Sequence, residues 1–486
     1  HCSWVHRDRH QATEKAKALV RVAVRRVGYQ EPLTIKEFPF NTNTLVVGGG
    51  IAGVQAALEI ASSGHKVYLV EREPSIGGHM SQLDTTFPTL DCSECILMPK
   101  TALVGSHPHI ELMAYSEVAA VSGYIGSFKV KIRRKARYVD ESKCTGCGLC
   151  QEKCPVAVPS EFNLSLSQRK AIYIPFPQAM PNLPVIDSEH CTYFVKGACR
   201  LCQQVCDAKA IDFEQVDRSV EVEVGSIILA TGYDLFDARL KPEYGYGVYP
   251  NVITGLELER LLSPAGPTHG IVQINGKVPQ NVVFIQCVGS RDKAVGKEYC
   301  SRVCCMYTAK HAHFIKERIP EAKVSVFYID IRALGKGCEQ LYERVQKEGV
   351  FYRRGSVSEI YRRGDKLVVR AEDTLLGELI EEEADLVVLA IGLVPRADAA
   401  QVMRMFALSP DLDGFFAERH IKLDPIATFT DGVFIVGCCQ GPKDIADTVA
   451  QASAGAAKVL ALISQGKVAR EVATAIVEEE ICSGCG

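Results

Sequence analysis

Residues 44–71, TLVVGGGIAGVQAALEIASSGHKVYLVE, decide the fold of this chain. A β-branched run at 44–47 leads into a glycine-rich turn at 48–53, and a stretch with helical periodicity continues to Ser63. A second apolar run, 66–70, then ends at Glu71. Strand, G-x-G-x-x-G, helix, strand and acid follow one another in the order that a dinucleotide-binding fold requires. The stretch therefore predicts a dinucleotide site, and a plain surface turn is the alternative.

Each glycine of the turn has an expected role. Gly48 permits the tight turn, Gly50 lets the backbone approach a pyrophosphate, and Gly53 lets the helix pack closely on the sheet. The helix N-terminus then faces the phosphates with its dipole and free N–H groups. Glu71 is placed to bind a ribose hydroxyl, which disfavours a nucleotide with a 2′-phosphate.

Later strands extend the pattern. Residues 226–233 (SIILATGY) and 385–396 (DLVVLAIGLVPR) are buried strands that end before a glycine, and 428–437 (TFTDGVFIVG) precede a helix at 444–463. Across roughly 44–466 this arrangement resembles the thioredoxin-reductase-like flavoproteins, which have two dinucleotide domains. The resemblance implies an α/β fold in which the first glycine motif binds FAD and the 428–437 segment closes over the flavin.

The FAD site implied by this resemblance draws on several segments. Related reductases have Gly-Asp after the last strand, whereas this chain has Gly437-Cys438-Cys439, so we expect the ribityl contact to come from the backbone or from Lys443 and Asp444. The expected cofactor-binding residues are Gly48, Gly50, Ile51, Ala52, Gly53, Glu71, Arg72, Gly77, Gly78, His79, Met80, Val118, Ala230, Thr231, Gly232, Gly437, Lys443, Asp444 and Ile445.

The bulk properties set outer limits. A chain of 486 residues is expected to form two or three domains, and its net charge of −3 does not favour nucleic acid or an anionic membrane as a partner. Its apolar runs fall short of the roughly 20 residues of a membrane helix. The chain starts without Met and ends within a Cys-rich motif, so we expect a piece of a longer protein. Twenty cysteines with C-x-x-C clusters favour metal in a reducing compartment.

Residues 144–155, CTGCGLCQEKCP, have the C-x2-C-x2-C-x3-C-P spacing of bacterial ferredoxins. A second set follows with C-x7-C-x2-C-x3-C spacing. Because the fourth cysteine of each run ligates the other cluster in two-cluster ferredoxins, two [4Fe–4S] clusters are expected, and zinc is the competing metal. The first ligand set is Cys144, Cys147, Cys150 and Cys206, and the second is Cys191, Cys199, Cys202 and Cys154. The strand pattern resumes at 219–224, so this module interrupts the flavin domain as a loop insertion.

The second dinucleotide domain departs from the expected pattern. Residues 281–287 (NVVFIQC) predict its first strand, but the glycine fingerprint for NAD(P)H is missing from the turn that follows. Four cysteines stand there instead, which matches a further [4Fe–4S] cluster or, alternatively, buried cysteines that pack as small apolar residues. They are Cys287, Cys300, Cys304 and Cys305.

The remaining cysteines allow several interpretations. Cys92 and Cys95 have three interpretations: a redox dithiol, a buried structural pair, or two ligands of a cluster completed by Cys2 and residues outside this sequence. We favour the interpretation as cluster ligands. Cys482 and Cys485 begin another ferredoxin-like motif, and Cys338 is expected to be structural.

The segments CVGSRD, YCSRVCCMYTAKHA, DCSECILMPK, HCSWVH and CQGPKDIADTVAQASA together resemble the A subunit of heterodisulfide reductase over essentially the whole chain. The resemblance implies a FAD and iron–sulfur oxidoreductase that performs electron bifurcation in cytoplasmic complexes of anaerobes. It implies heterodisulfide-reductase-type subunits, hydrogenase or formate dehydrogenase modules and ferredoxin as partners in a large hetero-oligomer. Lys310 is then expected to act on the flavin, with Glu257 as its carboxylate partner; the alternative is a solvated surface lysine on a helix that also carries Lys316 and Arg318.

The predicted domains follow the motifs. We expect 1–43 to be the end of an N-terminal domain and 467–486 the start of a C-terminal ferredoxin domain. The FAD-binding domain comprises 44–138, 215–275 and 396–466, the inserted ferredoxin domain 139–214, and the second dinucleotide domain 276–395. Two alternatives remain: an NAD(P)H-dependent disulfide or glutamate-synthase-type reductase, and a cluster-holding scaffold whose flavin is redox-silent.

Overall fold

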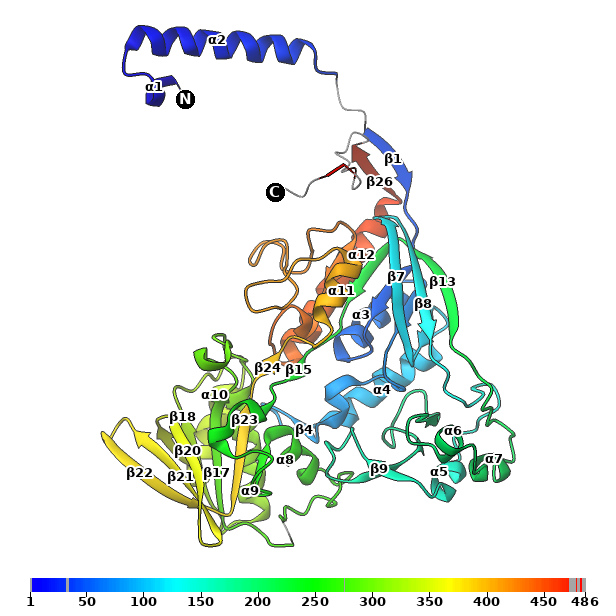
Figure 1. Cartoon of the computed structure of the whole chain (residues 1–486), viewed down its shortest axis with the longest axis vertical. Coiled ribbons are helices and arrows are strands. Elements are labelled where there is room, and N and C mark those ends of the chain that lie inside the picture. Colours follow the sequence, from blue (N-terminus) through cyan, green and yellow to red (C-terminus); the bar gives the residue numbers. More distant parts are fainter. Residues whose placement is uncertain (1, 32–34, 275, 472–477, 479–480, 483–486) are drawn as a thin grey trace. The chain divides into compact units, whose positions relative to one another are not determined.

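The computed structural model describes residues 2–31, 35–274, 276–471, 478 and 481–482, and Figure 1 shows the whole chain. The chain forms two units, one from residues 1–39 and 467–486 and one from residues 40–466. None of the helices in the described part of the chain combines the length and apolar character that a membrane crossing needs.

The smaller unit contains the chain ends. Helix α1 (Cys2–Val5) precedes helix α2 (Arg9–Gly28), and Asp8 caps α2 by accepting a hydrogen bond of 2.8 Å from the Gln11 N–H. Strand β1 (Ile35–Pro39) pairs antiparallel with β26 (Lys467–Glu471), so segments from the two ends of the sequence share a two-stranded sheet. The sequence patterns did not predict this pairing.

The larger unit begins with a five-stranded parallel sheet in the order β25-β14-β2-β3-β6. One side of the sheet carries helices, and α12 packs directly on α3. The sheet strands are β2 (Thr44–Val47), β3 (Val67–Val70), β6 (Ile110–Met113), β14 (Ser226–Leu229) and β25 (Val433–Ile435). The helices on this side are α3 (Ile51–Ser62), α4 (Ser93–Ser106) and α12 (Ile445–Gln465). Helix α11 (Ala399–Phe406) instead places its buried residues in the hydrophobic core of the antiparallel sheet described next.

A three-stranded antiparallel sheet packs against this first sheet. It has the order β13-β8-β7, with β7 at Ser116–Tyr124, β8 at Ser127–Arg134 and β13 at Arg218–Val224. In β8, Phe128, Val130 and Ile132 alternate with exposed residues and join Leu45 of β2 in one hydrophobic core. Alternation with a period of two places one face of a strand inside and the other in solvent.

The second dinucleotide domain repeats these layers. Its parallel sheet has the order β16-β23-β17-β18-β19, with helices in one core and an antiparallel sheet, β20-β21-β22, in the other. The parallel strands are β16 (Val252–Thr254), β17 (Asn281–Val288), β18 (Lys323–Tyr328), β19 (Phe351–Arg354) and β23 (Leu386–Ile391). The helices are α8 (Gly255–Leu262), α9 (Cys304–Arg318) and α10 (Cys338–Lys347). The antiparallel strands are β20 (Val357–Arg363), β21 (Lys366–Asp373) and β22 (Glu378–Ala384). A further pair, β15 (Asp234–Leu235) with β24 (Leu393–Val394), lies where the two domains join.

A cysteine-rich insertion, residues 135–217, runs between β8 and β13 (Figure 1). Its own core contains Val139, Ile172, Ile186, Ile211 and Phe213. It is attached to the first domain by backbone groups, because the Ile76 N–H donates to the Met180 carbonyl oxygen over 2.9 Å. Its elements are α5 (Leu149–Lys153), β9 (Ala157–Pro159), β10 (Gln168–Lys170), β11 (Ile172–Tyr173), β12 (Val185–Ile186), α6 (Thr192–Lys196) and α7 (Leu201–Gln204).

Candidate functional site: a nucleotide cavity and three cysteine sets

The glycine turn joins β2 to α3, which begins after Gly50. Gly48 has φ +107°, and a Cβ there would lie 2.3 Å from the Ala230 carbonyl oxygen. A Cβ on Gly53 would lie 1.8 Å from the Gly48 carbonyl oxygen, so both positions require glycine for close backbone packing. A Cβ on Gly50 would meet no atom within 4 Å. The Gly50 backbone is therefore open to the space where a pyrophosphate would approach.

A cavity of about 830 Å³ extends from this turn to the helices of the second domain. Its wall contains most of the expected cofactor-binding residues. They are Gly48, Gly50, Ile51, Ala52, Glu71, Arg72, Gly77, Gly78, His79, Met80, Val118, Ala230, Thr231, Gly232, Lys443, Asp444 and Ile445. Gly53 and Gly437 do not line it: Gly53 faces the backbone of the turn, and Gly437 packs on Ala52.

Glu71 occupies the predicted position at the end of β3. Its Oε2 accepts a hydrogen bond of 2.6 Å from the Gly49 N–H, and its Oε1 accepts one of 2.8 Å from the Glu73 N–H. Burial raises the pKa of the carboxyl, while these two backbone donors oppose the rise. The carboxylate thus holds the glycine turn in place and faces the cavity beside Arg72, whose guanidinium pairs with Asp398 over 2.5 Å.

The closing segment places a buried ammonium group at the cavity wall. Lys443 donates hydrogen bonds of 2.7 Å to the Gly437 and Gly441 carbonyl oxygens, and its side chain is only 8% exposed. Burial lowers the pKa of Lys443. Asp444 caps α12 by accepting from the Asp447 N–H over 2.7 Å, so the side chain predicted for a ribityl contact serves the helix.

The insertion contributes a wall of the cavity that the sequence patterns did not predict. Phe162 and Phe176 stack with their ring centroids 4.8 Å apart, and Arg260 of α8 lies over the Phe162 ring at 4.9 Å. Gln82, at the end of the short 3₁₀ helix Gly78–Gln82 that follows β3, donates to the Phe162 carbonyl oxygen over 3.0 Å. The lining residues from the insertion are Ser160, Glu161, Phe162, Arg169, Tyr173, Pro175 and Phe176. Tertiary packing alone brings them there, so no local motif marks them.

Lys310, on α9 of the second domain, also lines the cavity and is only 2% exposed. Its ammonium group donates to both carboxylate oxygens of Glu259, over 2.8 and 2.7 Å, and to the Thr85 carbonyl oxygen over 2.8 Å. His311 also bonds to Glu259 through its Nε2. Burial opposes the charge of Glu259, but Lys310 and His311 hold the pKa of its carboxyl well below the usual range.

The predicted partnership of Lys310 with Glu257 is wrong. Glu257 forms a capping box at the start of α8, because its Oε2 accepts from the Thr254 N–H and hydroxyl over 2.6 and 2.8 Å. Its Oε1 accepts from the Tyr246 hydroxyl over 3.1 Å. A carboxylate occupied in this way does not reach Lys310, and Glu259, two residues later on the same helix, takes that place.

The structure gathers each of the two ferredoxin-type cysteine sets in one place. The pKa of the Cys150 thiol is raised to about 11, first by burial and then by Cys144, Cys147 and Cys206 nearby. A separate small cavity, about 20 Å³, is lined by all four members of the second set, Cys154, Cys191, Cys199 and Cys202. The fourth cysteine of each run therefore lies with the other run.

The third set surrounds the end of β17 and the start of α9. Burial raises the pKa of Cys287 to about 12, with Cys305 and Cys300 among the neighbours that add to the rise. Burial also raises the pKa of Cys304 well above its usual value, and the other three cysteines of the set contribute. Val303 and Tyr307, on either side of Cys304 in sequence, line the large cavity. The third cysteine set is therefore next to the nucleotide cavity.

Among the described residues, no three His, Cys, Asp or Glu side chains converge closely enough to hold a single metal ion. A [4Fe–4S] cluster does not require such convergence, because each thiolate binds a different iron. The open space at Gly50 and the three groups of four thiols thus fit FAD and iron–sulfur clusters.

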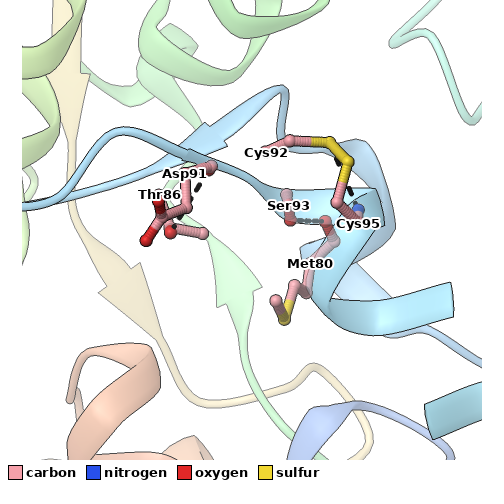
Figure 2. The surroundings of a disulfide bond; sticks show 6 residues. All are labelled: Met80, Thr86, Asp91, Cys92, Ser93 and Cys95. Atoms are coloured by element: carbon pink, nitrogen blue, oxygen red, sulfur yellow. Dashed lines mark hydrogen bonds between the residues drawn. A yellow bond between two sulfur atoms is a disulfide. The ribbon is translucent and has the colours of Figure 1, made fainter. Parts of the chain in front are cut away.

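Cys92 and Cys95 form a disulfide at the start of α4, with their Cα atoms 5.3 Å apart (Figure 2). This corrects the preference for cluster ligands, because sulfurs in a disulfide are not thiolates; the redox-dithiol alternative fits the observed bond. Ser93 between them donates to the carbonyl oxygen of Met80, a cavity residue, over 2.8 Å (Figure 2). Cys2 belongs to the smaller unit, Cys482 is exposed, and Cys485 lies outside the described residues.

Comparison with known families agrees with this site. Residues 43–103 match the FAD dependent oxidoreductase family, and residues 137–160 match the 4Fe-4S binding domain family. Together with the two parallel-sheet domains, these matches define an FAD- and iron–sulfur-containing oxidoreductase. The predicted fold class, a thioredoxin-reductase-like flavoprotein with an inserted ferredoxin domain, is confirmed.

Curated relatives match over the full chain. The chain is 51% identical to the A subunit of the H(2):CoB-CoM heterodisulfide,ferredoxin reductase of Methanothermobacter marburgensis, over 100% of this chain and 74% of the relative. It is 52% identical to the iron-sulfur A subunit of the CoB–CoM heterodisulfide reductase of Methanocaldococcus jannaschii, with the same coverage. The chain belongs to the family of heterodisulfide reductase A subunits, as its motifs predicted.

Solved structures show more distant likeness. The thioredoxin reductase of T. acidophilum is 14% identical with a TM-score of 0.48, and that of Lactococcus lactis is 15% identical with a TM-score of 0.49. Each alignment covers 87% of this chain and 99% of the other chain.

Proposed function

We propose that this chain redistributes electrons between a two-electron donor and one-electron carriers, by electron bifurcation at FAD in the large cavity. Bound FAD would supply the conversion, because isoalloxazine accepts electron pairs and releases single electrons whereas clusters carry single electrons. The observation that carries the proposal is the placement of the third cysteine set. Cys304 lies between Val303 and the helical turn that holds Tyr307, and both neighbours line the cavity.

The chain's own residues would bind and tune the cofactor. The turn at Gly50 and the N-terminus of α3 would hold the pyrophosphate, and Glu71 would bind the ribose. Lys310 would bring a buried positive charge to the flavin end of the cavity, where it stabilises negative charge more strongly than in water. Glu259 holds this ammonium group in place.

Partners are proposed from the names of the relatives. Those names include H(2), formate, ferredoxin and the CoB-CoM heterodisulfide. We propose that this chain works in a hetero-oligomer with heterodisulfide-reductase-type subunits, hydrogenase or formate dehydrogenase modules as donors, and ferredoxin as an acceptor. Clusters of free thiols suit a reducing compartment, which supports the cytoplasm as its location.

An anaerobic reductive titration tests the proposal, with visible and EPR spectra and an iron count. We expect FAD to bleach, and about twelve iron atoms per chain from three [4Fe–4S] clusters, besides any cluster at the chain ends. A flavin that stays oxidised would favour the scaffold alternative, and an iron count of no more than eight would remove the third cluster.

Two further arms sharpen this test. NADH or NADPH alone should not bleach the flavin, and rapid bleaching would favour the NAD(P)H-dependent reductase. Lys310→Ala should keep its FAD and iron content but require a lower potential for flavin reduction, because a cation near the reduced cofactor is lost. Equal potentials in parent and Lys310→Ala would exclude this role for Lys310.

A further inference from the structure

Tyr307 connects the third cysteine set with the nucleotide cavity. It lies one turn into α9, three residues after Cys304, and its ring is part of the cavity wall. Residues three apart on a helix share a face. One side chain thus contacts both the cavity and the start of the cysteine-bearing helix.

The Tyr307 hydroxyl and the Cys304 thiol meet at one carbonyl oxygen. The hydroxyl donates a hydrogen bond of 2.8 Å to the Ile391 carbonyl oxygen at the end of β23. The Cys304 thiol points to the same carbonyl, with Sγ and oxygen 3.7 Å apart. As a thiol, Cys304 is a donor in this corner.

A cluster would change this hydrogen bonding. A cysteine that ligates iron is a thiolate, which has no proton and only accepts. The Tyr307 hydroxyl is then the donor that Sγ and the Ile391 carbonyl share, and a bond to a charged acceptor is the stronger kind. The corner is therefore arranged to give the Cys304 sulfur a hydrogen bond when iron is bound.

The ring is held firmly in this position. A Cβ on Gly255, at the start of α8, would lie 2.9 Å from Cε2 of Tyr307, so the backbone of α8 packs directly against the ring. His311 is a second neighbour, with the ring centroids 5.6 Å apart. The hydroxyl thus has little freedom to leave the corner.

We propose that Tyr307 is the positioning residue that sets the reduction potential of the third cluster, through its hydroxyl beside the Cys304 sulfur. This inference rests on the cluster of the proposed function. Hydrogen bonds to cluster sulfurs raise the potential, because the reduced cluster carries one more negative charge. The step served is the transfer of one electron between the two cofactors, in which no bond is made or broken.

The test is an anaerobic EPR-monitored redox titration of the holoprotein and its variants. Cys304→Ala first identifies the signal of the third cluster by removing it, and lowers the iron content by about four atoms. Tyr307→Phe should shift the midpoint potential of that signal downward, leave the other cluster potentials unchanged and preserve the flavin absorbance, since the ring remains. A purely structural role would change thermal stability without this selective shift.

Two more variants make the result decisive. Gly255→Ala should push the ring from the α8 side and shift the same signal in the same direction. Tyr244→Phe, which removes a hydroxyl bonded to the Val357 carbonyl oxygen over 3.4 Å, should leave the potential at the parent value. An unchanged potential in Tyr307→Phe overturns the inference. Equal iron in Cys304→Ala and parent overturns the third cluster itself, and the two failures are therefore distinguishable.

Discussion

The two dinucleotide-type domains have the same layers but different loops at the same place. In each, the central strand of a five-stranded parallel sheet leads to a helix, β2 to α3 and β17 to α9. In the first domain only residues 48–50 connect the two elements, and in the second the connection is residues 289–303. The short loop exposes backbone to a cavity, whereas the long loop carries Cys300 between Cys287 of β17 and Cys304 and Cys305 of α9.

This difference shows what the fold decides and what the residues decide. In open parallel sheets, ligands bind outside the carboxyl ends of the strands, and both loops lie there. The position is a property of the fold, whereas the chemistry depends on side chains and glycines in the loop. Gly50 leaves space for a phosphate in one domain, and Cys304 brings a sulfur to the matching helix start in the other.

The largest expected effect is in the first loop. Gly50→Val should abolish FAD binding, because a branched side chain would fill the space that is open around the Gly50 backbone. Flavin absorbance after desalting measures occupancy, and the iron content should stay at the parent value. Retention of full FAD by this variant would contradict the assignment of the turn.

Gly48→Ala is the matched control, because its Cβ would meet the Ala230 backbone rather than the cavity. We expect it to lower the melting temperature, because a Cβ 2.3 Å from a carbonyl oxygen forces the turn to shift. Comparing Gly50→Val with Gly48→Ala thus distinguishes the loss of space for the ligand from the effect of backbone strain in the same turn.

In the second loop, Cys300→Ala should remove one cluster, about four iron atoms per chain, and leave FAD bound. Cys338→Ala removes another cysteine of the same domain, which is buried in the hydrophobic core at the start of α10. The control should keep its iron. Equal iron losses in both variants would mean that general destabilisation, and not ligation, explains the effect.

Sequence patterns predicted the features that depend on local order. The glycine turn and Glu71 lie within 28 residues, and the ferredoxin ligands follow a fixed spacing, so the chain alone specifies them. Phe162, Phe176 and Tyr307 were missed, because each contacts the cavity only through packing between elements distant in sequence. No periodicity or motif records that kind of contact.

The sequence predicted Glu257 as the partner of Lys310, whereas the structure has Glu259 in that place. This error shows a finer limit of sequence-based prediction. Two residues on a helix differ by about 200° around its axis, so they face opposite sides. Glu257 follows a threonine at capping-box spacing, which was visible in TGLE and assigns it to the helix start. The sequence located the helix near Lys310 but did not give its rotation.

Replacing Glu257 or Glu259 by glutamine tests which of the two glutamates pairs with Lys310. Glu259→Gln leaves the Lys310 ammonium buried without a counter-charge, and we expect a loss of about 3–5 kcal/mol of unfolding free energy. Glu257→Gln keeps a side chain that suits a capping box, so the loss should stay below about 1 kcal/mol. Chemical denaturation of both variants measures the two values. Similar losses would contradict the assigned pairing.

The smallest expected effect is a pH dependence from His311, which is bonded to Glu259 beside Lys310. Burial lowers the pKa of His311, although Glu259 opposes the shift. The unfolded chain, where a histidine titrates near 6.5, therefore binds more protons than the folded chain as the pH falls. The contribution of His311 to the unfolding free energy is therefore present above pH 6.5 and is lost as the pH falls below it, by at most about 1.4 kcal/mol per pH unit.

His311→Gln can still donate to Glu259 but cannot take up a proton. Between pH 7.5 and 5.5 the unfolding free energy of the parent should fall more steeply than that of His311→Gln, whereas Glu257→Gln should follow the parent. Parallel curves for parent and His311→Gln would show that this histidine does not change its protonation on folding.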